Sequence, residues 1–371
     1  MSNFLIITNV IHTKENNQYY GYSPYINEMN IWIKFADQVT IVAPLASRDI
    51  TPIDSAYDCN NLTFKKVPDF SFTTLKNRIT SLVKLPIIFY KIFIEMNRAD
   101  HIHLRCPGNM GLIGCFVQVF FPSKTKTAKY AGNWDPESKQ PWTYKLQKKV
   151  LSNTFLTKNM KVLVYGNWDK QSKNIKPFFT ASYLESEKEV IEKDDFNLGI
   201  KFIFVGSLTD GKNPLYAVKL IEALIKKGYN VSLDLYGEGI NRDLLLNYVN
   251  ANNLGMKISL KGNHDRRTIK EAYQKSHFVI LPSVSEGWPK AIAEGMFWGC
   301  VPIATKVSCI PYMLDNENRG ILLEMDLEKD CQKIEYILEE TAVYKDKNKK
   351  AADWSREYTL DVFQKEIKEM I

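Results

Sequence analysis

The sequence predicts an α/β protein with two doubly wound domains, each a parallel sheet covered by helices. Short apolar runs alternate with longer amphipathic runs, and this alternation occurs in two separate series along the chain. A chain of 371 residues has the length of about two domains. Its composition, 45% hydrophobic and 25% charged, is that of a globular protein. Each series is therefore expected to form its own core.

The first series predicts the sheet of an N-terminal domain spanning residues 1–175. Its apolar runs are typical of buried strands, and they lie at residues 4–11, 38–45, 62–68, 101–105, 127–132 and 160–166. Helical stretches are expected over residues 75–98 and 109–121. A polar, weakly periodic segment, residues 166–200, is expected to hold the linker.

The second series predicts a C-terminal domain spanning residues 176–355. Strands are expected at residues 201–207, 231–237, 257–262, 277–283, 301–306 and 320–324. Helices are expected at residues 213–227, 240–252, 267–275 and 289–298. A closing helix is expected at 356–371, because apolar residues from Trp354 to Ile367 recur near helical spacing and form a stripe that must pack on another element. The N-terminal domain is the expected partner.

Charge is spread unevenly and favours an anionic partner for the first half. Residues 1–180 carry 23 Lys and Arg against 12 Asp and Glu, whereas residues 181–371 carry 26 against 30. Nucleic acid, an anionic membrane surface or a phosphorylated substrate would suit the basic half, and so would an ordinary solvated surface. No apolar run is long enough for a spanning helix, and the start resembles a strand more than a signal peptide. Six scattered cysteines indicate a reduced, cytoplasmic chain without structural zinc.

The segment SVSEGWPKAIAEGMFWG, residues 283–299, predicts a ligand site at a strand-to-helix turn. The preceding strand ends at Ser283, and Pro289 suits the first turn of a helix. Gly287 allows close approach of a ligand to the backbone. Glu286 and Glu294 accept hydrogen bonds without donating any, which suits sugars and riboses. Two solvated glutamates near a helix start are the alternative explanation.

Two further turns support this site. A strand ends at Gly206 and Ser207, and Lys212 in the following loop could neutralise a diphosphate, although a lone loop lysine is usually only solvated. The next strand ends at Gly237-Glu238-Gly239. A dinucleotide fingerprint would need a third glycine where Arg242 stands, which counts against a dehydrogenase.

Taken in order, these motifs resemble the retaining nucleotide-sugar glycosyltransferases of family 4. The resemblance spans residues 201–315 and implies the GT-B architecture, two Rossmann-like domains facing a central cleft. The matching motifs are Gly206-Ser207-Leu208, Lys212, Gly237-Glu238-Gly239, Pro282-Ser283, Glu286-Gly287-Trp288-Pro289 with Glu294, and residues 299–305.

The resemblance implies a role for each of these residues. Lys212 would hold the diphosphate, and Glu294 would take the ribose hydroxyls. Glu286 would hold the donor sugar together with the backbone of Gly287, Trp288 and Pro289. Further donor contacts are expected from Gly206, Ser207, Gly237, Ser283 and Gly21. No cofactor and no metal are expected, because enzymes of this architecture normally bind none.

The sequence departs from the family pattern at several positions. Ser207 replaces an arginine that binds the diphosphate, and Cys309 to Tyr312 replace Gly-Ile-Pro-Glu. Gly21 stands where the family has a glycine-rich loop, although a lone loop glycine is more often an ordinary turn residue. Arg105 replaces the last histidine of an Asp-x-x-His-x-His strand. An arginine there suits an anionic group, so Arg105 is predicted to be catalytic beside Glu286 and Lys212, and a surface arginine is the alternative.

The predicted function is transfer of a hexose from a nucleotide-diphosphate sugar to a saccharide acceptor. The apolar stretch from Leu82 to Phe93, flanked by Lys84 and Lys91, is either a core helix or a membrane-surface helix at the inner face of the cell membrane. The second interpretation predicts peripheral contact with anionic lipid and a lipid-linked acceptor, as in surface polysaccharide assembly. Trp288 could stack on a sugar or pack in the core. Alternatives are a nucleotide-sugar epimerase and an inactive module that binds a glycan; nucleic acid is not expected.

Overall fold

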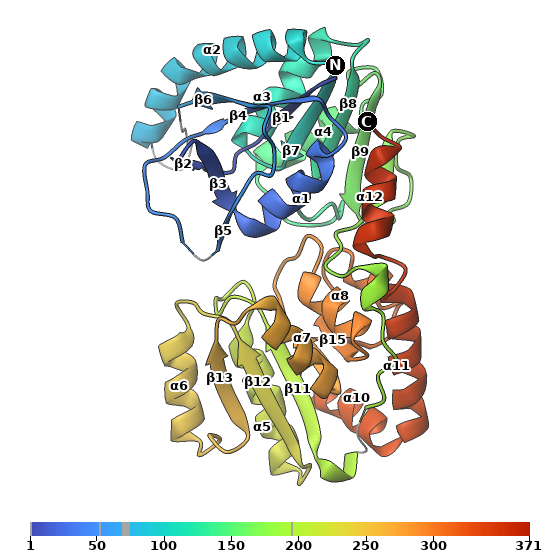
Figure 1. The fold of residues 1–371 in the computed structure, drawn as a ribbon. Helices are drawn as coiled ribbons and strands as arrows, with labels where there is room; N and C mark the ends of the chain where they lie inside the picture. The colour runs from blue at the N-terminus through green and yellow to red at the C-terminus, as the bar shows by residue number, and fades with distance from the viewer. Residues whose placement is uncertain (1, 52, 69–74, 194–195) are drawn as a thin grey trace. The chain divides into compact units, whose positions relative to one another are not determined.

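The chain forms two compact units, each built around its own sheet (Figure 1). The computed structural model describes residues 2–51, 53–68, 75–193 and 196–371, without side chains for residues 75–83. Unit 1 consists of Met1–Phe178 with Gln364–Ile371, and unit 2 consists of Phe179–Phe363.

Unit 1 contains a seven-stranded parallel sheet in the order β10-β9-β8-β7-β1-β4-β6. The chain builds outward from β1 in one direction and from β7 in the other, which is the doubly wound arrangement. The six predicted strands are present as β1 Asn3–Ile7, β4 Gln38–Pro44, β6 Leu62–Val67, β7 His101–Cys106, β8 Thr125–Tyr130 and β9 Met160–Tyr165.

Four short strands of unit 1 were not predicted. β10 (Ile175–Phe178) pairs with β9 inside the segment assigned to the linker, so that assignment is wrong for these residues. Only its two end residues are buried, which is too little apolar content to mark a strand. A small antiparallel sheet is formed by β2 (Thr13–Glu15), β3 (Gln18–Tyr22) and β5 (Asp54–Ala56).

Strand alternation decides which helices cover each face of this sheet. Phe4 and His103 lie on one face, where the Trp32 ring of α1 (Ser23–Ile33) packs with ring centroids 6.0 and 4.4 Å away. Leu5 and Leu104 point to the opposite face, into the core cluster that includes residues of α2 and α3. The helices α2, α3 and α4 span Leu75–Arg98, Asn109–Val117 and Trp142–Leu151, and the 3-10 turn η1 spans Gln118–Phe120.

The apolar stretch predicted as a core or membrane-surface helix lies in α2. The side chains of Leu82 and Val83 are outside the described part, but those that follow divide between two faces. Ile88 and Ile92 are fully buried, whereas Ile87 is 52% and Tyr90 66% exposed. The helix therefore packs on the core with one face and leaves apolar side chains on the other. Among the helices formed by the described residues, none is both long and apolar enough to cross a membrane.

Unit 2 contains a six-stranded parallel sheet in the order β13-β12-β11-β14-β15-β16. All six strands were predicted, and they span Ile200–Val205 (β11), Val231–Tyr236 (β12), Ile258–Gly262 (β13), Phe278–Leu281 (β14), Val301–Thr305 (β15) and Ile321–Leu323 (β16). The strand order reverses between β11 and β14, and ligands of open α/β sheets bind outside the carboxyl ends of strands at such a point.

The predicted helices of unit 2 are confirmed to within two residues. They are α5 Pro214–Lys226, α6 Arg242–Ala251, α7 Arg266–Lys275 and α8 Lys290–Phe297, and they are joined by α9 Ile310–Met313, α10 Leu327–Glu339, α11 Thr341–Ser355, η2 Glu185–Glu187 and η3 Phe196–Leu198. Pro289 is the N-cap of α8 rather than its first residue. Gly299 follows the helix with a φ of 73°, the left-handed conformation expected there.

The closing segment contains the start of a separate helix, α12 (Leu360–Lys368), after a break that follows Ser355. The hydroxyl of Thr359 accepts a hydrogen bond from the Val362 N–H at 3.3 Å, which marks the new helix start. Phe363 is 1% and Ile367 0% exposed, so the predicted apolar stripe is buried. The last turn belongs to unit 1, where Lys161 Nζ donates to the carbonyl oxygen of Glu369.

Candidate functional site

Most of the site residues predicted from sequence lie in unit 2, at or just after the carboxyl ends of its strands. The loops that follow β11 and β12 hold each other through main-chain hydrogen bonds, from Gly206 N to Tyr236 O and from Leu208 N to Glu238 O, both 2.9 Å. Gly237 has a φ of 144°, and a Cβ there would be 1.9 Å from the carbonyl oxygen of Gly206. Only glycine fits at this crossing, so Gly206 and Gly237 shape the backbone of the site.

Lys212 and Glu286 form an ion pair between the loops that follow β11 and β14. Lys212 Nζ is 2.5 Å from Glu286 Oε1, and the lysine side chain is 29% exposed against 6% for the glutamate. The two loops are also joined by a main-chain hydrogen bond of 2.9 Å from Val284 N to Gly211 O. The structure therefore brings two predicted residues together at the reversal point of the sheet, with the ammonium as the more accessible partner.

Residues at the end of β15 and just after it hold the Glu286 loop in place. The hydroxyl of Thr305 donates to the carbonyl oxygen of Ser283 at 2.5 Å. The Ser308 hydroxyl and the Cys309 thiol both donate to the carbonyl oxygen of Gly287 at 3.2 Å. Burial raises the pKa of the Cys309 thiol to about 12, so it remains a protonated donor. This support explains how a turn that departs from the family pattern at Cys309 still orders the loop.

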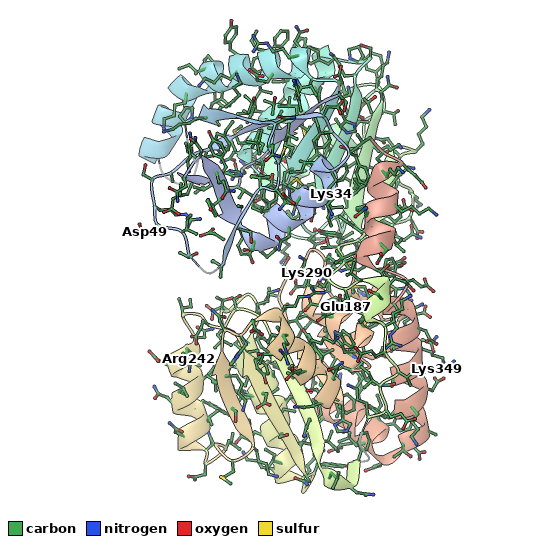
Figure 2. All side chains as sticks on the ribbon, in the orientation of Figure 1. Lys34, Asp49, Glu187, Arg242, Lys290 and Lys349 are labelled. Atoms are coloured by element: carbon green, nitrogen blue, oxygen red, sulfur yellow. The ribbon has the colours of Figure 1, made fainter. Side chains whose placement is uncertain are left out.

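The start of α8 supplies hydrogen-bond donors but not at every predicted residue. The first N–H groups of a helix have no acceptor within the helix, and Lys290 occupies the first position of α8 (Figure 2). Pro289 has no N–H, so its backbone cannot donate to a sugar as expected. Its predicted role is therefore limited to beginning the helix.

Trp288 packs inside unit 2. It is 7% exposed, and its ring lies 6.1 Å from that of Trp354, nearly parallel, and 5.7 Å from that of Tyr358. Both partners belong to the apolar stripe near the C-terminus. The structure thus corresponds to the core-packing alternative, and stacking on a donor sugar by this ring is not available.

Glu294 faces a different set of partners from Glu286. One carboxylate oxygen accepts from the Ser182 hydroxyl at 2.6 Å, and the other from the Tyr273 hydroxyl at 3.5 Å. Burial raises the pKa of the Glu294 carboxyl above its ordinary value, although the Ser182 hydrogen bond opposes the shift. The side chain lines a small recess together with residues 180–183 and Tyr358. Its proposed contact with a ribose would replace the two hydroxyls that it binds here.

The two predicted serines differ in exposure. Ser207 is exposed, with its hydroxyl 3.4 Å from that of Thr209. Ser283 is 0% exposed, so its side chain cannot contact a ligand in this conformation. The carbonyl oxygen of Ser283 accepts from Thr305, so this residue supports the loop, and its predicted contact with the donor stays a prediction.

Arg105 lies in unit 1 within a buried ionic cluster. Its guanidinium donates to Glu28 Oε1 at 2.8 Å, and Lys129 Nζ is 3.2 Å from the same oxygen. The Lys129 and Glu28 side chains are 1% and 4% exposed, whereas that of Arg105 is 18% exposed. Two cations thus share one carboxylate at the carboxyl ends of β7 and β8, which leaves an excess of positive charge on the side where Arg105 is accessible.

Two other residues of unit 1 that the sequence analysis considered are His103, in the strand of Arg105, and Gly21. His103 precedes Arg105 on the same face of β7, and burial lowers its pKa well below the ordinary value, so the ring is neutral at pH 7. It cannot supply positive charge to a ligand. Gly21 lies buried within β3, paired with Ser55, and not in a loop after the first strand. Its predicted placement is wrong because the small antiparallel sheet was not foreseen.

Sequence reasoning missed Lys129 and Glu28. The sequence did indicate Lys129, because this lysine lies within an otherwise buried strand, and a buried lysine needs a charged partner. Its partner comes from α1, 101 residues earlier, and no local pattern links the two. Within the described part of the chain, no group of three or more His, Cys, Asp or Glu side chains is arranged to hold a metal ion.

The GT-B architecture consists of two doubly wound domains, and this chain has two such units. Similarity to solved structures supports the same fold. The structure of HepE from Anabaena in complex with UDP-glucose superposes with a TM-score of 0.68 at 12% sequence identity, covering 100% of this chain and 99% of that one. At that identity the similarity shows the fold alone, and the fold is GT-B.

The sequence comparisons find similarity to glycosyltransferases. Residues 186–356, within unit 2, match the model of the family described as glycosyl transferases group 1. Protein CapJ of Staphylococcus aureus is 23% identical over 304 residues, which cover 79% of this chain and 75% of CapJ. The UDP-Gal:alpha-D-GlcNAc-diphosphoundecaprenol alpha-1,3-galactosyltransferase of Escherichia coli is 31% identical over 156 residues, which cover only 38% of this chain and 39% of that enzyme.

Proposed function

We propose that the protein transfers a hexose from a nucleotide-diphosphate sugar to a lipid-linked saccharide, with retention of anomeric configuration. The observation that carries the proposal is the Lys212–Glu286 pair, placed at the reversal point of the unit 2 sheet inside the segment that matches the family. A cation at this point suits a diphosphate, and a carboxylate beside it suits sugar hydroxyls.

In this reaction the bond between the anomeric carbon and the diphosphate oxygen breaks, and the nucleotide diphosphate departs with the electron pair. The acceptor hydroxyl forms the new bond and releases its proton. The Lys212 ammonium stabilises the charge that develops on the departing diphosphate, assisted by the N–H groups at the start of α8. The chain itself supplies the positive charge, so we propose that no metal is required.

A lipid-linked acceptor is supported by the name of the Escherichia coli relative, which acts on a diphosphoundecaprenol-linked sugar. The Arg105 cluster in unit 1 has excess positive charge and suits an anionic acceptor. The exposed Ile87 and Tyr90 of α2 support peripheral contact with an anionic membrane. UDP-sugars are the first donors to test, because a UDP-sugar appears in the name of that relative.

The test is product formation from a panel of UDP-, GDP-, ADP- and TDP-sugars with diphosphate-lipid-linked saccharides. We expect a glycosylated acceptor only when both substrates are present, with the donor's anomeric configuration in the NMR spectrum. An inverted linkage would refute the retaining mechanism. A changed donor sugar without acceptor would instead identify an epimerase.

A further inference from the structure

A lysine-lined cavity lies in unit 1 at the amino ends of three strands. Its volume is about 650 Å³, and its lining comprises Pro122, Thr125, Lys126, Thr154, Thr157, Lys158, Asn159, Met160, Lys161, Lys173, Asn174, Lys176 and Met370. These residues surround the starts of β8, β9 and β10. Ligands of the predicted reaction are expected at the carboxyl ends of strands, so this cavity is at the opposite edge of its sheet.

Five lysines line the cavity, and among its described lining residues there is no Asp or Glu. None of the five lysines forms an ion pair with another residue of the described chain. A concave surface lined by charges of one sign concentrates its field and raises the local concentration of counterions. The cavity therefore attracts anions.

The lysines differ in how far they are already engaged. Lys126 is 1% exposed, and its ammonium donates to the carbonyl oxygens of Gln118 and Phe121, which leaves one of its three donors. Lys161 donates to one carbonyl oxygen, that of Glu369. Lys158, Lys173 and Lys176 are exposed and donate no hydrogen bond to the described chain.

Three neutral polar residues of the lining, Thr157, Asn159 and Asn174, form hydrogen bonds that build the wall. Asn159 Nδ2 donates to the carbonyl oxygen of Pro122 at 3.0 Å. Asn174 Nδ2 donates to the carbonyl oxygen of Leu151 and to the Thr157 hydroxyl, which itself donates to a main-chain oxygen. The segments that carry the lysines are thus tied together, while the lysine ammonium groups keep unused donors. The Lys158 ammonium also lies 5.4 Å from the centre of the Phe155 ring. Hydrogen-bonded walls that carry ammonium groups with unused donors are suited to binding an anion.

We propose that this cavity binds a multiply charged phosphate anion. Lysine acts as a point charge for phosphate oxygens, and several negative charges are needed to match several lysines. The volume exceeds that of a single phosphate group and lies in the range of small-ligand sites. The phosphates could belong to a free oligophosphate or to clustered lipid headgroups, and the experiment separates these sources.

The test is calorimetric titration of the full chain with inorganic triphosphate at constant ionic strength. The triple variant Lys158→Gln, Lys173→Gln, Lys176→Gln should bind at least about tenfold more weakly, because three charges are removed from the site. The control variant Lys34→Gln, Lys275→Gln, Lys345→Gln removes the same charge from exposed positions elsewhere and should bind as the wild type does; Lys34 is labelled in Figure 2. Thermal melting verifies that both variants are folded.

Two further measurements test whether triphosphate binds at the donor site instead, and whether the phosphate comes from a free anion or from lipid headgroups. Lys212→Ala should keep this triphosphate binding, and loss of all binding in that variant would overturn the proposal. A second outcome is that the wild type binds phosphatidylglycerol vesicles but not triphosphate. If the Lys158→Gln, Lys173→Gln, Lys176→Gln variant loses that vesicle binding and the control variant keeps it, the site is supported and assigned to lipid headgroups. Absence of binding to both probes, or equal loss in pocket and control variants, would overturn it.

Discussion

Lys212 and Glu286 come from loops that are 74 residues apart and meet at 2.5 Å. Sequence motifs predicted that both contact the donor, but not that they contact each other. The contact matters because Glu286 is nearly buried and needs a cation or a ligand hydroxyl beside it. Lys212 is thereby held at the sheet edge while its outer side stays accessible.

Lys212→Ala tests the role of this ammonium. The substitution should lower kcat about 100-fold or more, which is the usual effect of removing one group that stabilises developing negative charge in the transition state. The variant should be destabilised by about 1 to 3 kcal/mol, because the nearly buried Glu286 loses its charged partner, but it should remain folded, because this loss is smaller than the usual stability of a domain. Initial rates and thermal melting measure the two effects. Lys219→Ala, an exposed lysine of α5, is the control, and wild-type turnover in Lys212→Ala would contradict the diphosphate assignment.

Glu294→Ala tests the predicted ribose contact. Removing the carboxylate should weaken UDP binding about tenfold, the effect of losing one or two hydrogen bonds to a charged acceptor. Calorimetric titration measures the affinity. Because Ser182 and Tyr273 hold the carboxylate in the absence of ligand, Ser182→Ala is an informative companion: it should keep or improve UDP affinity. Unchanged affinity in Glu294→Ala would show that the ribose binds elsewhere.

Glu294 also predicts a pH dependence of stability. Its pKa is raised in the folded state from an ordinary value of 4.5, chiefly by burial. The native state therefore holds this proton more tightly than the unfolded chain, and the free energy of unfolding falls as pH rises from about 4.5 through the raised pKa. Glu294→Gln removes this dependence, so its stability relative to wild type should increase over that range. Urea denaturation between pH 4 and 8 measures it, with the exposed Glu271→Gln as control; a difference that is constant with pH would refute the prediction.

At the scale of elements, the loops of unit 2 are arranged by close backbone crossings. The turn after β12 crosses the end of β11 at Gly237, where a side chain would collide with a carbonyl oxygen. Sequence analysis recognised the glycine as part of a motif but assigned it to ligand contact. The structure adds a reason internal to the fold, because the crossing sets the position of the loop that carries Lys212.

Gly237→Ala should therefore destabilise the protein by about 2 kcal/mol or more, since it combines a left-handed φ with a backbone collision. Gly211→Ala, in the neighbouring loop, is the matched control: nothing lies within 4 Å of its Cβ position, and its φ is not in the left-handed range. We expect a change within about 0.5 kcal/mol there. Chemical denaturation gives both values, and equal effects of the two substitutions would refute the argument.

At the scale of the whole molecule, the two units divide the predicted chemistry. The segment that matches the family, with Lys212 and Glu286, lies in unit 2, and Arg105 lies in unit 1. The basic excess of the chain is also in the first half, where the Arg105 cluster and the lysine-lined cavity occur. Donor binding and acceptor binding should therefore respond to different substitutions.

Arg105→Gln tests this division. Glu28 keeps Lys129 as a partner in the variant, so the fold should be retained. UDP affinity should be unchanged, whereas kcat/KM for the acceptor should fall about tenfold, which corresponds to about 1.4 kcal/mol of lost transition-state binding. Arg98→Gln, an exposed arginine of the same unit, is the control. A loss of UDP affinity in Arg105→Gln would place Arg105 in the donor site.

The sequence by itself determined the two parallel sheets, their main strands, and the set of loops that carry the candidate donor site. Apolar periodicity and turn residues are local properties, and they can be read along the chain. The order of the motifs then placed Lys212, Glu286 and Glu294 at the same edge of one sheet.

Only the tertiary structure decided which of these residues touch and which are buried. It paired Lys212 with Glu286, turned Trp288 into the core, and joined Arg105 and Lys129 to Glu28. It also placed Gly21 in a strand and gathered lysines at the opposite edge of unit 1. Each of these contacts joins segments that are far apart in the chain, and such contacts depend on the path of the whole fold, which no local pattern contains.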